Sequence, residues 1–279
     1  MAYKSLLTVL TDVQTIKTPL AHLVALAEAQ DGHADALCLG VDRTQTGYYY
    51  AGANAMILQE TITRAHNEAA EILAGATAIF EKSNARWSAE EGVAQLPDIG
   101  RHVAHVARFS DLVVLPQPYG PDRGTELEPV VEAALFEGRA PVLVVPDQGD
   151  PNPKPEQIVV AWNESRESLA AIRAALPFLT AAKLVRICVI DPPEHGPERS
   201  DPGGMLSQML ARHGVHCEID VLSKTLPRVS DVLSRHVVDT DAQMLVMGAY
   251  GHSRFREAIL GGATRNMLEK APVPVLMAH

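Results

Sequence analysis

Strand-like and helix-like segments alternate along this chain, and their order repeats once. Nearly uninterrupted aliphatic runs, such as residues 5–12 and 157–165, are each followed by a segment whose apolar residues recur with helical spacing. A strand with one face in water would alternate polar and apolar residues, so these runs are typical of a parallel sheet that helices cover on both faces. The repeat therefore predicts two doubly wound α/β domains.

Each half is expected to form a five-stranded, mostly parallel sheet flanked by helices. In the first half we expect strands over residues 5–12, 34–42, 85–92, 111–116 and 140–146 and helices over 19–30, 54–82 and 98–110. In the second half we expect strands over 157–165, 183–191, 217–224, 243–248 and 273–278 and helices over 166–176, 205–212 and 228–238.

The length of the chain, 279 residues, suits two domains of about 140 residues each. The most proline-rich gap is DQGDPNPKP at residues 147–155, where prolines favour extended backbone between two apolar runs. We therefore expect an N-terminal domain over 1–146, a linker over 147–155 and a C-terminal domain over 156–279.

Composition limits the partners and the compartment. The net charge of −10 argues against a nucleic-acid partner, because such binding relies on a basic surface that neutralises phosphates. The three cysteines suit a reducing compartment. The first apolar run has no cleavage site after it, and no uncharged run approaches the roughly 18–20 residues that cross a bilayer. We expect a cytoplasmic protein that binds neither nucleic acid nor membrane.

A cluster of glycines follows the strand expected at 243–248. Its members are Gly248, Gly251, Gly261 and Gly262. Residues without side chains let several backbone N–H groups approach a phosphate chain, and a helix opening near Thr264 would add its free N–H groups and the positive end of its dipole. His252 and Ser253 offer further donors. The alternative is a pair of ordinary tight turns, and we favour a phosphate-binding loop.

The spacing Gly-x2-Gly-x9-Gly, together with the Pro-Val-x-Val that opens the last strand, resembles the universal stress protein family. The resemblance follows both halves in element order and is specific in sequence only near the C-terminus. It implies that ribose and phosphates contact Gly248, Gly251, His252, Ser253, Gly261, Gly262, Ala263 and Thr264. It places adenine against Ala161, Val189 and Met247, and it implies that the fifth strands of the two halves pair edge to edge.

The chain departs from the family pattern at two positions of the C-terminal half. Gly262 stands where the family has serine or threonine, and Asn163 stands where nucleotide-binding members have an aspartate. Asn163 still donates and accepts hydrogen bonds, so it stays among the expected ligand contacts.

The N-terminal half lacks the glycine cluster, although it keeps Asp12 at the aspartate position. Prolines stand where open N–H groups would be needed; they are Pro116, Pro118 and Pro121. We therefore interpret this half as a degenerate partner. The aromatic run Tyr48, Tyr49 and Tyr50 is more typical of loop packing or an interface than of a ligand site.

No nucleophile or metal motif is present, so no catalytic residue is predicted and slow hydrolysis of bound ATP is the most that we expect. The histidine groups His102 with His105 and His213 with His216 lack enough ligands for a metal. The predicted function is a stress-response sensor or regulatory module that binds ATP or AMP, with Mg²⁺ as an optional companion. An unidentified signalling protein and a second copy of the chain are its expected partners. The alternatives are a scaffold or small-ligand carrier without nucleotide affinity and a weak ATPase or kinase.

Overall fold

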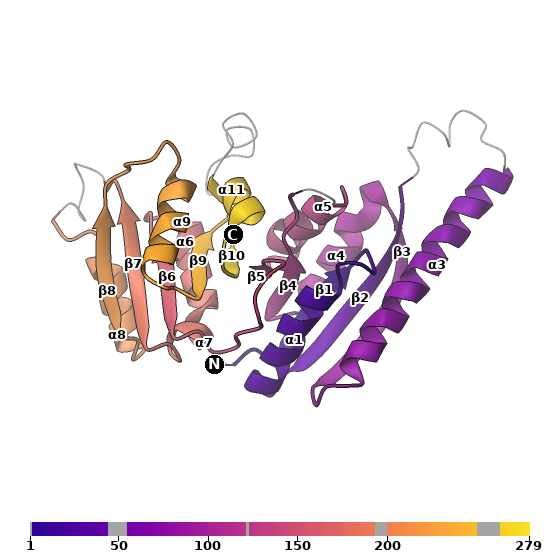
Figure 1. Cartoon of the computed structure of the whole chain (residues 1–279), viewed down its shortest axis with the longest axis horizontal. Coiled ribbons are helices and arrows are strands. Elements are labelled where there is room, and N and C mark those ends of the chain that lie inside the picture. The colour runs from indigo at the N-terminus through magenta and orange to yellow at the C-terminus, as the bar shows by residue number, and fades with distance from the viewer. Residues whose placement is uncertain (1, 44–54, 121–122, 193–199, 250–262) are drawn as a thin grey trace. The chain divides into compact units, whose positions relative to one another are not determined.

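The computed structural model describes residues 2–43, 55–120, 123–192, 200–249 and 263–279. Contacts divide the chain into two compact units, whose main parts are Tyr3–Ala140 and Pro141–His279. They are called the N-terminal and the C-terminal unit below, and Figure 1 shows the elements of each.

The N-terminal unit has a parallel sheet in the order β3-β2-β1-β4. Its strands are β1 (Ser5–Leu10), β2 (His33–Asp42), β3 (Arg86–Gln95) and β4 (Leu112–Pro116). Its helices are α1 (Lys17–Gln30), α3 (Ala55–Phe80), α4 (Ile99–Ala107) and α5 (Leu127–Glu132), with short 3₁₀ and π-helical turns at Leu96–Asp98 and Ala133–Glu137. Helices α1 and α3 pack together, and α4 packs with α5, as expected for right-handed crossovers that cover both faces of the sheet. The core includes the stacked rings of Phe80 and Trp87, 5.0 Å apart.

The C-terminal unit has the strand order β5-β10-β9-β6-β7-β8. Its strands are β5 (Val142–Val145), β6 (Gln157–Ala161), β7 (Leu184–Ile190), β8 (Cys217–Leu222), β9 (Met244–Gly248) and β10 (Val275–Ala278). Its helices are α6 (Arg166–Ala174), α7 (Leu176–Leu179), α8 (Gly204–Arg212), α9 (Val229–Asp239) and α11 (Ala263–Lys270). All neighbours from β10 to β8 are parallel.

Strand β5 pairs antiparallel with β10, with Val144 opposite Val275 and Val142 opposite Met277. All four side chains are buried. This pairing is why the division by contacts falls before Pro141, ahead of the linker expected at 147–155.

The α/β fold with a mostly parallel, open sheet flanked by helices is confirmed. Several boundaries differ from the sequence prediction. Strand β6 ends at Ala161 instead of continuing to residue 165, because a turn begins there. Strand β3 runs on to Gln95. The acidic residues Glu126 and Glu128 are typical of a helix start, and α5 begins there, with a buried face at Leu127, Val130 and Val131.

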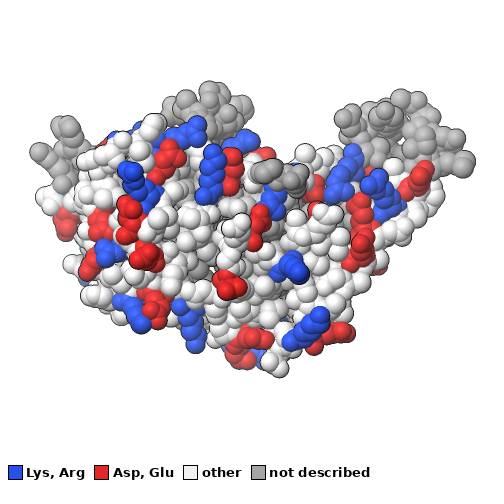
Figure 2. All heavy atoms as spheres, viewed as in Figure 1, with Lys and Arg blue, Asp and Glu red and all other residues white. Residues whose placement is uncertain are grey.

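Charged side chains of both signs are interspersed on the face shown in Figure 2, with no broad single-sign area among the described residues visible there. In the parts of the chain that the structure describes, no helix is both long enough and apolar enough to cross a membrane.

Candidate functional site

Three neighbouring strands of the C-terminal unit end at one edge of its sheet. Strand β6 lies between β9 and β7, with Val160 opposite Val246 and Ala161 opposite Cys188. The chain order reverses between β6 and β9, and in doubly wound sheets such a switch point at the carboxyl ends of the strands is where ligands collect. The three residues expected to contact adenine, Ala161, Val189 and Met247, all lie at these ends, and Val189 and Met247 are buried.

A tight turn follows β6 and starts the next helix. The side-chain Oδ1 of Asn163 accepts a hydrogen bond from the backbone N–H of Ser165 at 3.2 Å, and Glu164 between them has φ of 61°. Ser165 then caps α6 by accepting from the N–H of Ser168 at 3.1 Å. The oxygen of Asn163 is therefore used by the turn, while its NH₂ group lies on an exposed side chain.

Gly248, the last residue of β9, lies against the first turn of α6. A Cβ atom at this position would come within 2.5 Å of the Ser168 nitrogen and 2.7 Å of the Glu167 carbonyl carbon. Backbone atoms cannot move aside as a flexible side chain can, so this packing requires glycine at position 248. The sequence interpretation assigned Gly248 to phosphate contact only and missed this structural role.

Helix α11 supplies the remaining described part of the predicted site. Because β9 and β10 are parallel, the helix between them runs back along the sheet, which places its N-terminal end at the carboxyl edge of the strands. Its free N–H groups and the positive end of its dipole therefore lie at that edge of the sheet. Thr264 is 3% exposed and is the second residue of this helix.

Several predicted contacts lie outside the described residues. They are Gly251, His252, Ser253, Gly261 and Gly262, and the aromatic run Tyr48, Tyr49 and Tyr50 also lies there. Ala263 is described as the first residue of α11.

No group of three or more His, Cys, Asp and Glu side chains that could hold a metal ion occurs within the described residues.

Comparison with known proteins identifies the family. Residues 155–279 match the sequence profile described as the universal stress protein family. This half of the chain thus carries the sequence pattern of the universal stress protein family. A universal stress protein of Synechocystis is 28% identical over 141 residues, which make up 49% of this chain and 46% of that protein. The match thus spans less than half of that relative's length.

Solved structures show that the universal stress protein fold extends over both halves. A universal stress protein from Archaeoglobus fulgidus aligns over 98% of this chain and 95% of its own with a TM-score of 0.69 and 15% identity. A functionally unknown protein from Pseudomonas aeruginosa aligns over 99% of this chain and 92% of its own with a TM-score of 0.54, also at 15% identity. At this identity the likeness concerns the fold alone.

The N-terminal unit has a different set of side chains at the corresponding edge of its sheet. Arg43 directly follows β2, and its Nη2 donates to Glu126 Oε1 at 2.8 Å while its Nη1 donates to Glu68 Oε2 at 3.0 Å. The Glu126 side chain is only 2% exposed. Burial lowers the pKa of Arg43, but the hydrogen bonds and charges of Glu126 and Glu68 outweigh this and raise the pKa above its ordinary value.

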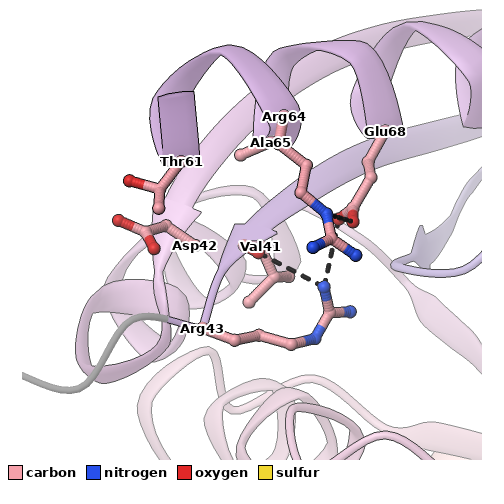
Figure 3. Close-up of a pocket in the computed structure, with 7 residues that line it drawn as sticks. All are labelled: Val41, Asp42, Arg43, Thr61, Arg64, Ala65 and Glu68. Atoms are coloured by element: carbon pink, nitrogen blue, oxygen red, sulfur yellow. Dashed lines mark hydrogen bonds and ion pairs between the residues drawn. The ribbon is translucent and has the colours of Figure 1, made fainter. Parts of the chain in front are cut away.

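Figure 3 shows the guanidinium of Arg43 beside Glu68 and below Arg64. All three residues line a cavity of about 230 Å³. Sequence analysis did not select these residues. Their partners lie on separate elements, and an arginine after a strand is not by itself a signal.

Proposed function

We propose that the C-terminal unit binds an adenine nucleotide, ATP or AMP, and that the chain acts as a stress-response sensor or regulatory module. The single observation that carries the proposal is the convergence of the ends of β6, β7 and β9 at the switch point with the N-terminal end of α11. The family membership of this half supports it.

The chemistry of this edge suits the two parts of a nucleotide. Ala161 is partly exposed and offers apolar surface to a base, and the exposed NH₂ group of Asn163 offers a donor to a hydroxyl. The N-terminal end of α11 favours an anion through its free N–H groups, which makes it the place for the phosphates. Any Mg²⁺ would enter with the phosphates, since the described residues contain no cluster of acidic ligands for it.

The same proposal has three further parts. The chain acts in the cytoplasm, it associates with a second copy of itself, and a signalling protein responds to its nucleotide-bound state. A nucleotide sensor needs a partner that distinguishes its bound from its free state. The antiparallel pairing of β5 with β10 covers an otherwise open strand edge of the C-terminal unit, and such a covered edge discourages non-specific strand addition.

A scaffold or small-ligand carrier without nucleotide affinity is the second candidate, and two observations favour it. Asn163 Oδ1 already accepts from Ser165, and Gly248 is required by its packing against α6. Both features of the motif thus have a structural reason that needs no nucleotide.

Equilibrium dialysis of the full chain against labelled ATP and AMP separates the two candidates. We expect saturable binding at ligand concentrations up to about 1 mM, which corresponds to about −4 kcal/mol. Gly251→Val and Gly261→Val should abolish it, because each side chain would fill the space of the phosphates. Gly100→Ala in α4 is the control, since a Cβ there meets nothing closer than 3.7 Å.

Mass spectrometry of the purified protein provides an independent check by identifying any retained nucleotide. Absence of binding by the unmodified chain, or unchanged affinity in both valine variants, would rule out the nucleotide site and leave the scaffold.

A further inference from the structure

Arg228 stands at the start of α9, where a positive charge is unusual. It occupies the capping position directly before the helix, and a guanidinium cannot accept a hydrogen bond from the free N–H groups of the first turn. Serine, threonine, aspartate and asparagine are the residues favoured at this position, and the N-terminal end of a helix carries a partial positive charge. The dipole of α9 therefore repels the charge of Arg228.

No carboxylate in the described part of the chain compensates for this repulsion by pairing with Arg228. Its Nη1 donates to Asn266 Oδ1 of α11 at 3.3 Å, which is the one hydrogen bond that it forms there. Asp231 lies in the first turn of α9 and makes no ion pair with it. Arg43 of the N-terminal unit, in contrast, is held by two carboxylates. The exposed guanidinium of Arg228 thus keeps its charge and most of its five donors for an anion.

The bond to Asn266 places this guanidinium beside the start of α11. Helix α9 follows β8, which is parallel to the strands next to it, so α9 begins at the same carboxyl edge of the sheet as α11. The two helices pack together, and Ser234 Oγ donates to Met267 Sδ at 3.6 Å. Asn266 is the fourth residue of α11, about 4.5 Å along the helix axis from Ala263. The guanidinium therefore lies within about one helical turn of the free N–H groups of α11.

A cation at this place distinguishes nucleotides by their number of phosphates. The free N–H groups at the start of a helix can hold one phosphate group without further help. A triphosphate carries two more groups and more negative charge, so it gains more from a guanidinium beside the helix start than a monophosphate does. Arginine also suits this contact because its planar donors match the oxygens of a phosphate.

We propose that Arg228 contacts the phosphates of the bound nucleotide beyond the first and makes the C-terminal unit prefer ATP to AMP. Asn266 holds the guanidinium in position for this contact. The triphosphate supplies the negative charge that Arg228 otherwise lacks at the start of α9. This inference rests on the nucleotide site proposed above, and it makes Arg228 a specificity-determining residue of that site.

Equilibrium dialysis of the full chain against labelled ATP and labelled AMP, at low salt and one fixed magnesium concentration, tests the inference. We expect the unmodified chain to bind ATP more tightly than AMP. Arg228→Gln should weaken ATP binding at least about fivefold, as for the loss of a charge-assisted hydrogen bond at an exposed position, and should change AMP binding by less than about twofold.

Arg235→Gln is the matched control, because Arg235 is exposed on the same helix and lies about 10 Å further along its axis. It removes the same charge and should alter neither affinity. A loss of ATP affinity in both variants would mean that net charge, and not the position of Arg228, decides the preference.

Arg228→Gln also separates binding from folding. Glutamine keeps a donor for Asn266 and removes a charge that the dipole of α9 repels, so the melting temperature should stay equal or rise while ATP affinity falls. An unchanged ratio of ATP to AMP affinity in Arg228→Gln, equal effects of Arg228→Gln and Arg235→Gln, or a preference of the unmodified chain for AMP would each overturn this inference alone. Absence of binding of both nucleotides by the unmodified chain would overturn it together with the nucleotide site.

Discussion

Asp12 and Asn163 form the same turn at corresponding places in the two halves. Each comes shortly after the first strand of its half, and each accepts a hydrogen bond through Oδ1 from the backbone N–H two residues later, at 2.9 Å from Gln14 and 3.2 Å from Ser165. Aspartate and asparagine are favoured in such turns because their side-chain oxygen imitates a backbone acceptor. The two halves of the sequence repeat thus share this side-chain-to-backbone hydrogen bond.

The turn at Asn163 has a testable consequence for stability. Asn163→Ala removes the acceptor and should lower the free energy of unfolding by about 1 kcal/mol. Asn163→Asp keeps the acceptor and should stay within about 0.5 kcal/mol of the unmodified chain. Urea unfolding followed by circular dichroism measures both, and equal losses in the two variants would contradict the role assigned to this oxygen.

Gly248→Ala tests whether packing alone explains this glycine. The added Cβ would overlap the backbone at Ser168, so we expect a loss of about 1–3 kcal/mol in the free energy of unfolding. Gly100→Ala serves as the matched comparison, since a Cβ there would make only ordinary van der Waals contacts, at 3.7 Å or more, and alanine stabilises a helix by up to about 1 kcal/mol. If Gly248→Ala unfolds at the same urea concentration as the unmodified chain, the close approach to α6 is not rigid.

The ion pair between Arg43 and Glu126 makes a prediction about paired and single substitutions. Arg43→Met leaves the buried carboxylate of Glu126 without its partner and should cost about 2 kcal/mol or more, whereas Arg43→Met with Glu126→Leu should recover much of that loss. A double-mutant cycle of urea unfolding gives the coupling between them. Additive losses would mean that the two side chains act independently.

High pH should destabilise the protein through two buried thiols. Burial, with a smaller effect of Glu91, raises the pKa of Cys38 to about 12, and burial, with a smaller effect of Asp220, raises the pKa of Cys188 to about 12. A raised pKa means that the contribution to stability is fully present below the ordinary thiol pKa of 9.0 and is lost as the pH rises toward 12.

Each thiol should therefore lower the free energy of unfolding by about 1.4 kcal/mol per pH unit in this window. Urea midpoints of the unmodified chain and of Cys38→Ala with Cys188→Ala, at about pH 8 and about pH 10.5, measure the effect. The double variant should lose less stability between the two conditions. Parallel losses would show that other groups dominate the alkaline transition.

Much of the fold was predictable from local pattern, and the exceptions have local causes. Nearly all of the expected strands and helices are present, because continuous aliphatic runs and helical spacing are properties of neighbouring residues. The expected strand at 157–165 was too long because apolar Trp162 continues the run, while Asn163 and Glu164 already form a turn.

The candidate sites were also predictable from the sequence only in part. The strand ends that carry Ala161, Val189 and Met247 follow from element order and a general rule for parallel sheets, and the structure places them at neighbouring ends. The packing of Gly248 against α6 and the contact of Arg228 with Asn266 were not predictable, because each depends on atoms from segments distant in sequence.

Sequence pattern was therefore sufficient for the fold class and the repeat, both of which depend on the order and spacing of nearby residues. The assignment of β5 to the C-terminal unit and the pairing of Arg43 with Glu126, 83 residues apart, required the folded chain. Such contacts form only when strands from distant segments come together, and a one-dimensional pattern does not specify which side chains then meet.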